Sequence, residues 1–284
     1  MKRILIPTDF SDNAINALHY VIHLMENERC TFFLLNTYTP TSLYTSTIYE
    51  YHTSLNIDLG EIYKNTSEHK LQRLIDDVTT TFSNDKHQFE KIASCNMLVN
   101  EIVDLTESKS IDFIVMGTQG ASGLKEIFIG SQTMHTIKKT TVPLLCVPKD
   151  FTYKDPKDIL FATDYNLSIE NIGLSLVKNL CSIHHSRLIL LNAYYGVPLD
   201  ERQEEVKNQM DLYFKGNAHQ FYISDGMDVS EALEDFQSKH RIDLLVMVHN
   251  KHSFFENLLF TPVINKIAHH TQIPFLVIPA IEKK

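Results

Sequence analysis

The chain has 284 residues and a formal net charge of −9, with 43% hydrophobic and 21% charged residues. An acidic balance argues against a general binder of nucleic acid or of anionic membranes, because both need a surplus of Lys and Arg to neutralise phosphate. No uncharged apolar run approaches the roughly 20 residues of a membrane helix. The beginning of the chain, MKRILIPTDFSD, is unlike a secretory signal. The four cysteines lie far apart, so we expect them to be reduced and buried in a cytoplasmic protein.

Short apolar runs alternate with helical patterns along the first half of the chain. We expect strands near 2–7, 31–37, 88–94, 112–116 and 143–147, and helices near 12–27, 59–82, 100–109 and 131–139. Ser11 and Asp12 can cap the first helix. Strands that are apolar throughout and are separated by helices predict a parallel sheet covered on both faces.

The second half of the chain repeats the first. Matching segments occur in the same order, namely 2–10 with 157–165, 34–38 with 190–194, 111–116 with 242–247, and 140–148 with 271–279. A repeat of this kind predicts two homologous domains. We place them at 1–148 and 157–284, joined by a polar linker at 149–156. Each is expected to be a doubly wound, Rossmann-like α/β domain with an open, parallel, five-stranded sheet.

A glycine-rich segment, MGTQGASGLKEIFIGSQT, follows the fourth predicted strand at residues 116–133. Glycines allow backbone N–H groups to approach phosphate oxygens closely, and the helix that starts at Ser131 adds free donors and a favourable dipole. Asp9 and Thr37 also follow strands, so all three features can face one crevice at the carboxyl ends of the sheet. No Lys precedes Ser131, which excludes the P-loop motif of nucleotide triphosphatases.

Together these motifs resemble the universal stress proteins. The spacing Gly117-x2-Gly120-x9-Gly130-Ser131, combined with ILIPTDFS at 4–11 and TVPLLCVP at 141–148, is similar to the nucleotide-binding signature of that family. The resemblance covers both halves and implies a tandem arrangement with strand order 3-2-1-4-5 in each. It also implies that the halves pair through their last strands, 144–147 and 275–278, as an intramolecular pseudo-dimer. A homodimer of whole chains stays open.

The resemblance implies that the first half binds ATP. Any Mg²⁺ is expected to arrive with the triphosphate. Asp9 matches the acidic residue that helps to hold the adenosine, and Thr37 matches the position whose backbone contacts adenine. Gly117 and Gly120 match the ribose and phosphate side, and residues 130–133 match the triphosphate cradle. Gln119 departs from the family, which often has Arg or His there. The complete predicted site comprises Pro7, Thr8, Asp9, Thr37, Met116, Gly117, Gly120, Gly123, Gly130, Ser131, Gln132 and Thr133.

The second half has lost the glycines of this site. The matching positions hold Val248, Lys251, Phe254 and Thr261-Pro262. Side chains occupy the space where backbone must approach phosphate, and proline lacks an N–H donor. Although Asp164 persists, we expect one nucleotide per chain, bound in the first half only.

Three functions remain open at this stage. The first is an ATP-binding regulator of the stress response that acts on an unidentified protein partner. The second is a slow ATPase using the same cradle, although no water-positioning base, and so no catalytic residue, is identifiable. The third is a nucleotide-independent module built on the apolar segment 254–260 of the second half. The Thr-, Ser- and Tyr-rich stretch 39–70 is either a lid or a surface excursion.

The remaining polar motifs favour structural roles. Among the 14 histidines, His249 and His252 have HxxH spacing, and residues 184–185 and 269–270 are adjacent pairs. No Cys or acidic partner stands at ligand spacing, so we predict no metal site held by the protein. Asp112 and Asp243 begin equivalent strands, which favours hydrogen bonding to backbone.

Overall fold

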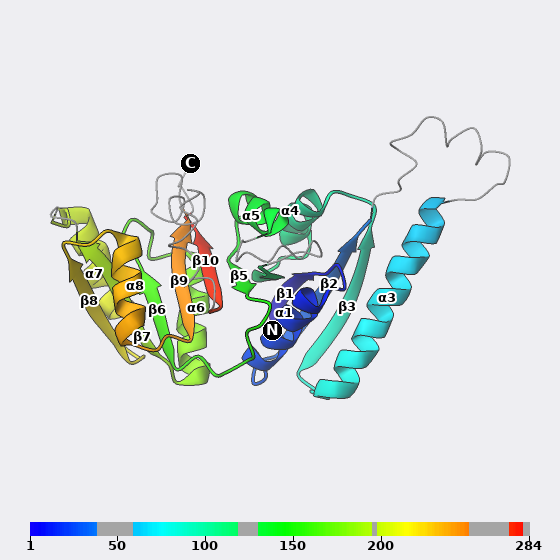
Figure 1. Cartoon of the computed structure of the whole chain (residues 1–284), viewed down its shortest axis with the longest axis horizontal. Helices are drawn as coiled ribbons and strands as arrows, with labels where there is room; N and C mark the ends of the chain where they lie inside the picture. The colour runs from blue at the N-terminus through cyan, green and yellow to red at the C-terminus, as the bar shows by residue number, and fades with distance from the viewer. Residues whose placement is uncertain (39–58, 119–129, 195–197, 250–272, 281–284) are drawn as a thin grey trace.

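The computed structural model describes residues 1–38, 59–118, 130–194, 198–249 and 273–280. Figure 1 shows two α/β halves side by side, joined through one sheet. The elements of the first half are β1 (Lys2–Pro7), α1 (Asp12–Leu24), β2 (Cys30–Thr37), α3 (Leu59–Phe82), β3 (His87–Ser94), α4 (Leu98–Ser108), β4 (Phe113–Gly117), α5 (Ser131–Lys139) and β5 (Leu144–Val147). Those of the second half are β6 (Asp158–Ala162), α6 (Ile172–His184), β7 (Arg187–Tyr194), α7 (Glu201–Tyr213), β8 (His219–Asp225), α8 (Val229–Lys239), β9 (Leu244–His249) and β10 (Phe275–Pro279).

The described strands form one ten-stranded sheet in the order β3-β2-β1-β4-β5-β10-β9-β6-β7-β8. Neighbouring strands are parallel within each half, whereas β5 and β10 are antiparallel. Each half therefore has the expected strand order. The predicted pairing of the last strands is also confirmed, because Phe275 lies opposite Cys146 and Val277 opposite Leu144.

Local interactions explain where the helices begin. Ser11 is the N-cap of α1 and its Oγ accepts a hydrogen bond from the N–H of Ala14 at 3.3 Å. The helix ends at Leu24, three residues before the end predicted from the sequence, and Met25 is its C-cap. The helix predicted at 59–82 is confirmed as α3. The end of the stretch 39–70, expected to be a lid or a surface excursion, is therefore helical from residue 59, and residues 39–58 lie outside the described part of the chain. The helix forms there because it packs on the edge of the sheet and buries Leu71 and Val78.

The two strand-initiating aspartates have the structural role that the sequence predicted. Oδ2 of Asp112 accepts a hydrogen bond from the N–H of Arg3 at 2.7 Å. Oδ2 of Asp243 accepts hydrogen bonds from the N–H groups of Lys157 and Asp158, at 3.0 and 3.2 Å. In each half the carboxylate therefore joins the start of the fourth strand to the start of the first.

The prediction that all four cysteines are buried is wrong for Cys95, which is exposed, whereas Cys30, Cys146 and Cys181 are buried; all four are free thiols. Cys95 immediately follows β3, which is the outermost of the described strands at this end of the sheet and pairs on one side only. Among the described helices, none combines the length and the apolar character that crossing a bilayer requires.

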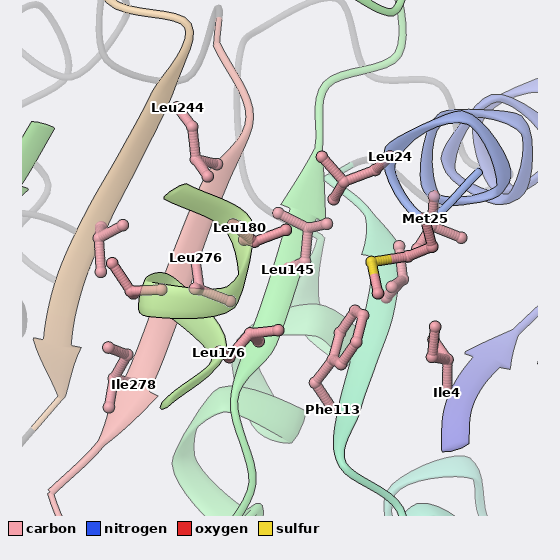
Figure 2. Close-up of a cluster of buried hydrophobic side chains, with 14 of the residues drawn as sticks. Ile4, Leu24, Met25, Phe113, Leu145, Leu176, Leu180, Leu244, Leu276 and Ile278 are labelled. Atoms are coloured by element: carbon pink, nitrogen blue, oxygen red, sulfur yellow. The ribbon is translucent and has the colours of Figure 1, made fainter. Parts of the chain in front are cut away.

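The halves share a hydrophobic core where they meet. Figure 2 shows Leu145 of β5 beside Leu276 of β10, with Leu180 of α6 and Leu24 of α1 packed close by. Leu276 is 0% exposed and lies opposite Leu145 in the antiparallel pair. One cluster of buried side chains thus extends from the first half into the second, so neither half can be removed without exposing it.

We expect Leu276→Ala to lower the free energy of unfolding by about 2–5 kcal/mol, because it leaves a cavity in this shared core. Ile223→Ala is the matched control, since Ile223 is 57% exposed on edge strand β8. Its effect should stay within about 0.5 kcal/mol. Urea unfolding followed by circular dichroism measures both, and equal midpoints for the two variants would contradict a shared core.

Candidate functional site

A cavity of about 300 Å³ lies at the carboxyl ends of β1, β2 and β4, beside the first turns of α1 and α5. This volume is at the lower end of the range typical of ligand sites. Every predicted site residue that the structure describes lines it. Gly120 and Gly123 lie outside the described residues. The described lining residues are Pro7, Thr8, Asp9, Asn13, Ala14, Asn36, Thr37, Leu98, Met116, Gly117, Gly130, Ser131, Gln132 and Thr133.

Sequence reasoning missed four of these lining residues: Asn13, Ala14, Asn36 and Leu98. A signal existed for Asn36, because the Leu-Leu-Asn segment recurs in the second half with Asn192. In both halves this side chain holds the loop after the first strand. Nδ2 of Asn36 donates to the carbonyl oxygen of Thr8 at 2.7 Å, and Nδ2 of Asn192 donates to that of Thr163 at 3.0 Å. The other three occupy first turns of helices, which no spacing in the sequence brings to the site.

The start of α5 forms one wall of the cavity. Its N-cap is Gly130, which has no side chain to cap the helix, so Ser131, Gln132 and Thr133 begin it without a side-chain acceptor. By contrast, side chains cap α1, α6, α7 and α8. Oγ1 of Thr133 donates to the carbonyl oxygen of Gly117 at 3.0 Å, and the N–H of Gly130 donates to that of Thr118. These bonds hold the helix start against the end of β4, and the uncapped residues 131–133 line the cavity.

Gly117 has a steric reason to be glycine that the sequence did not reveal. A Cβ atom at this position would lie 2.2 Å from Nδ2 of Asn13. Asn13 belongs to the first turn of α1 and is 3% exposed, so it has little room to move aside. Gly117 therefore lets α1 pack closely on β4, in addition to any part it plays toward a ligand.

The described lining of the cavity has one ionisable side chain, that of Asp9. Its Oδ1 accepts hydrogen bonds from the N–H of Ser11 at 3.0 Å and from Ser11 Oγ at 2.5 Å. The carboxylate thus shapes the turn between β1 and α1. No Lys or Arg lines the described part of the cavity.

The corresponding region of the second half is built differently. Nε2 of Gln203, in the first turn of α7, donates to the carbonyl oxygen of Asp164 at 2.8 Å, so α7 begins against the loop that follows β6. Val248 stands where the first half has Gly117, and it is buried. The helices after the first strand of each half also begin differently. The second residue of α1 is Asn13, whereas the second residue of α6 is Gly173, which has no side chain. The predicted departures Lys251, Phe254, Thr261 and Pro262 lie outside the described residues, as do the apolar segment 254–260 and His252.

Two described histidines each pair with one carboxylate, His184 with Asp155 and His219 with Asp211. Within the described ranges, no group of three or more His, Cys, Asp or Glu side chains is arranged to hold a metal ion.

Comparison with known proteins identifies the family. A model of the universal stress protein family matches residues 1–148 and 180–279. The chain belongs to the universal stress protein family. Universal stress protein MJ0577 of Methanocaldococcus jannaschii is 29% identical over 158 residues, which cover 52% of this chain and 95% of that protein. Universal stress protein YxiE of Bacillus subtilis is 24% identical over 146 residues, covering 51% and 98% respectively.

A solved universal stress protein matches the whole tandem arrangement. The crystal structure from Archaeoglobus fulgidus has a TM-score of 0.66 and 18% sequence identity, and the match covers 98% of each chain. This similarity shows the fold. The two curated relatives are each about as long as one half, so this chain carries two universal stress protein units in tandem.

We expect Gly117→Ala to destabilise the protein by about 1–3 kcal/mol, because the added methyl group must displace Asn13. Asn13→Ala removes the obstructing amide, so the double variant should be more stable than the sum of the two single effects predicts. A coupling energy of about 0.5–3 kcal/mol is expected from a double-mutant cycle of urea unfolding. Strict additivity would contradict the contact between the two residues.

Proposed function

We propose that this universal stress protein binds one ATP per chain, in the cavity of the first half, and acts as a nucleotide-dependent regulator. The observation that supports this most is the start of α5, which has a glycine N-cap without a side-chain cap and lines a cavity of about 300 Å³. Such a helix start is suited to phosphate, since its donors and its dipole both favour an anion.

The lining of the cavity suits both the phosphate part and the adenosine part of a nucleotide. Residues 131–133 supply backbone donors on the phosphate side, and Leu98 and Met116 supply apolar surface away from it. We assign Asp9 and Thr37 to the adenosine side, where a carboxylate can accept hydrogen bonds from ribose hydroxyls. Mg²⁺ would be held chiefly by the phosphates and water, because Asp9 is the only described lining residue with a carboxylate.

We favour regulation over ATP hydrolysis because of the position of Asp9. Its Oδ1 already accepts two hydrogen bonds from Ser11, so it serves the turn before α1. The other described lining side chains are neutral, and none is a general base of the usual kind. A protein partner would then recognise the nucleotide-bound form of the chain. The site does not define the identity of that partner.

The asymmetry between the halves supports a single site. In the second half, the position of Gly117 is filled by buried Val248, and α7 begins against Asp164 through Gln203. Isothermal titration of the nucleotide-free protein with ATP and Mg²⁺ tests this proposal. We expect one site per chain, whereas two sites or no binding would contradict it. Sustained phosphate release in the same samples would favour the ATPase instead.

Ser131→Pro should weaken ATP binding about tenfold or more, because it removes one N–H donor to phosphate, worth about 1.5–3 kcal/mol when the acceptor is charged. The backbone accepts this change. Ser131 is the first residue of α5, where proline is tolerated, and Gly130 has φ −55° and ψ 146°, as a residue before proline requires.

Ser131→Ala is the matched control, because it removes the hydroxyl and keeps the N–H group. We expect it to retain most of the affinity measured by titration. Equal affinities for the proline variant and the wild type would contradict a role for this N–H group in binding phosphate.

A further inference from the structure

The C-terminal end of α1 is held by two histidines from different parts of the chain. Nε2 of His87, at the start of β3, lies 3.0 Å from the carbonyl oxygen of Met25. Nε2 of His184, at the end of α6, lies 2.8 Å from that of Leu24. The last carbonyl groups of a helix have no partner within it, and the imidazole of His184 supplies a donor to Leu24. The carbonyl oxygen of Met25 also accepts from the N–H of Glu28 at 2.9 Å, so His87 adds a second contact there. His87 contacts this helix end from within the first half and His184 contacts it from the second.

The side chain of His184 is 8% exposed, and the charged side chains that act on it in the described part of the chain are Asp155 and Lys157. Nδ1 lies 3.5 Å from Oδ1 of Asp155, in the segment that joins the halves. Asp155 also accepts a hydrogen bond from the hydroxyl of Tyr153 at 2.8 Å and pairs with Nζ of Lys157 at 3.3 Å. Nζ of Lys157 in turn donates to the carbonyl oxygen of His184 at 2.8 Å. From α1, the group facing the imidazole is the carbonyl oxygen of Leu24.

These contacts indicate the tautomer and the protonation state of the His184 imidazole. A carbonyl oxygen can only accept, so Nε2 carries the proton that binds Leu24. The neutral ring satisfies this contact without placing a charge in a buried position. Burial lowers the pKa of His184 below its ordinary value of 6.5, an effect that the carbonyl of Leu24 and the carboxylate of Asp155 oppose and that Lys157 reinforces.

We propose that neutral His184 is an acid-released latch that fastens the second half to the C-terminal end of α1. Protonation places a positive charge in the buried contact between α6 and α1, and relief of that cost comes from opening the contact to water. The two halves remain joined, because the pairing of β5 with β10 has no side chain that titrates in mild acid. Opening is therefore confined to the last turns of α1 and α6.

The sign of the pH dependence follows from linkage. A histidine whose pKa is lower in the closed state than in the open state binds fewer protons when closed. The latch is therefore fully effective above about pH 6.5 and is lost as the pH falls through its lowered pKa. One proton changes the opening equilibrium by at most about tenfold per pH unit.

Hydrogen exchange on the nucleotide-free full chain tests the latch. We would follow peptides covering residues 19–28 and 178–188 from pH 7.5 to pH 5, corrected for intrinsic exchange. The wild type should lose protection in the 178–188 peptide below pH 6.5. His184→Gln keeps an N–H donor for Leu24 and cannot be protonated, so its protection there should be independent of pH.

His87→Gln is the matched control, because His87 binds the same helix end from within the first half and its pKa is also lowered by burial. This variant should change the acid response of the 19–28 peptide and leave that of the 178–188 peptide as in the wild type. The same acid response of the 178–188 peptide in His184→Gln and in the wild type would overturn the proposal.

A second measurement does not depend on any variant. The imidazole of His184 in the wild type should titrate below 6.5 in an NMR pH series, and titration at or above that value would overturn the latch. Both measurements are made without nucleotide, so their outcome is independent of whether ATP binds in the cavity.

Discussion

The antiparallel pairing of β5 with β10 is the contact on which the rest of the structure depends. Each half contributes a parallel sheet that would otherwise end in an unpaired strand, which invites association with other chains. Joining the two ends within one chain removes both edges and brings Leu145 against Leu276 in a common core. It also fixes the ends of α1 and α6 close enough for His184 to reach Leu24.

The same geometry decides where a ligand can bind. In a parallel sheet, the loops at the carboxyl ends gather where the strand order reverses, here between β1 and β4. The apolar runs of the sequence predict these strands closely, because burial on both faces leaves little freedom in composition. Strand order and pairing of the halves came from the family resemblance, since periodicity alone does not specify which strands are neighbours.

The cavity could be predicted in part. Residues that follow strands directly, such as Asp9 and Thr37, could be placed because the end of a strand is visible in the sequence. Asn13 and Leu98 could not, because their position depends on how α1 and α4 lie across the sheet. The steric reason for glycine at 117 could not be predicted either, because it depends on contact with a side chain of α1 that is distant in sequence.

Helix α1 contributes both to the cavity and to the contact with the second half. α1 is 13 residues long, or roughly 20 Å at the rise of an α-helix. Its first turn supplies Asn13 to the cavity, and Asn16 donates to the carbonyl oxygens of Pro148 and Phe151 in the segment that joins the halves. Its last turn meets His184. If occupancy of the cavity changes the stability of the contact between His184 and Leu24, thermodynamic reciprocity requires that this contact change the affinity of the cavity for its ligand by the same factor.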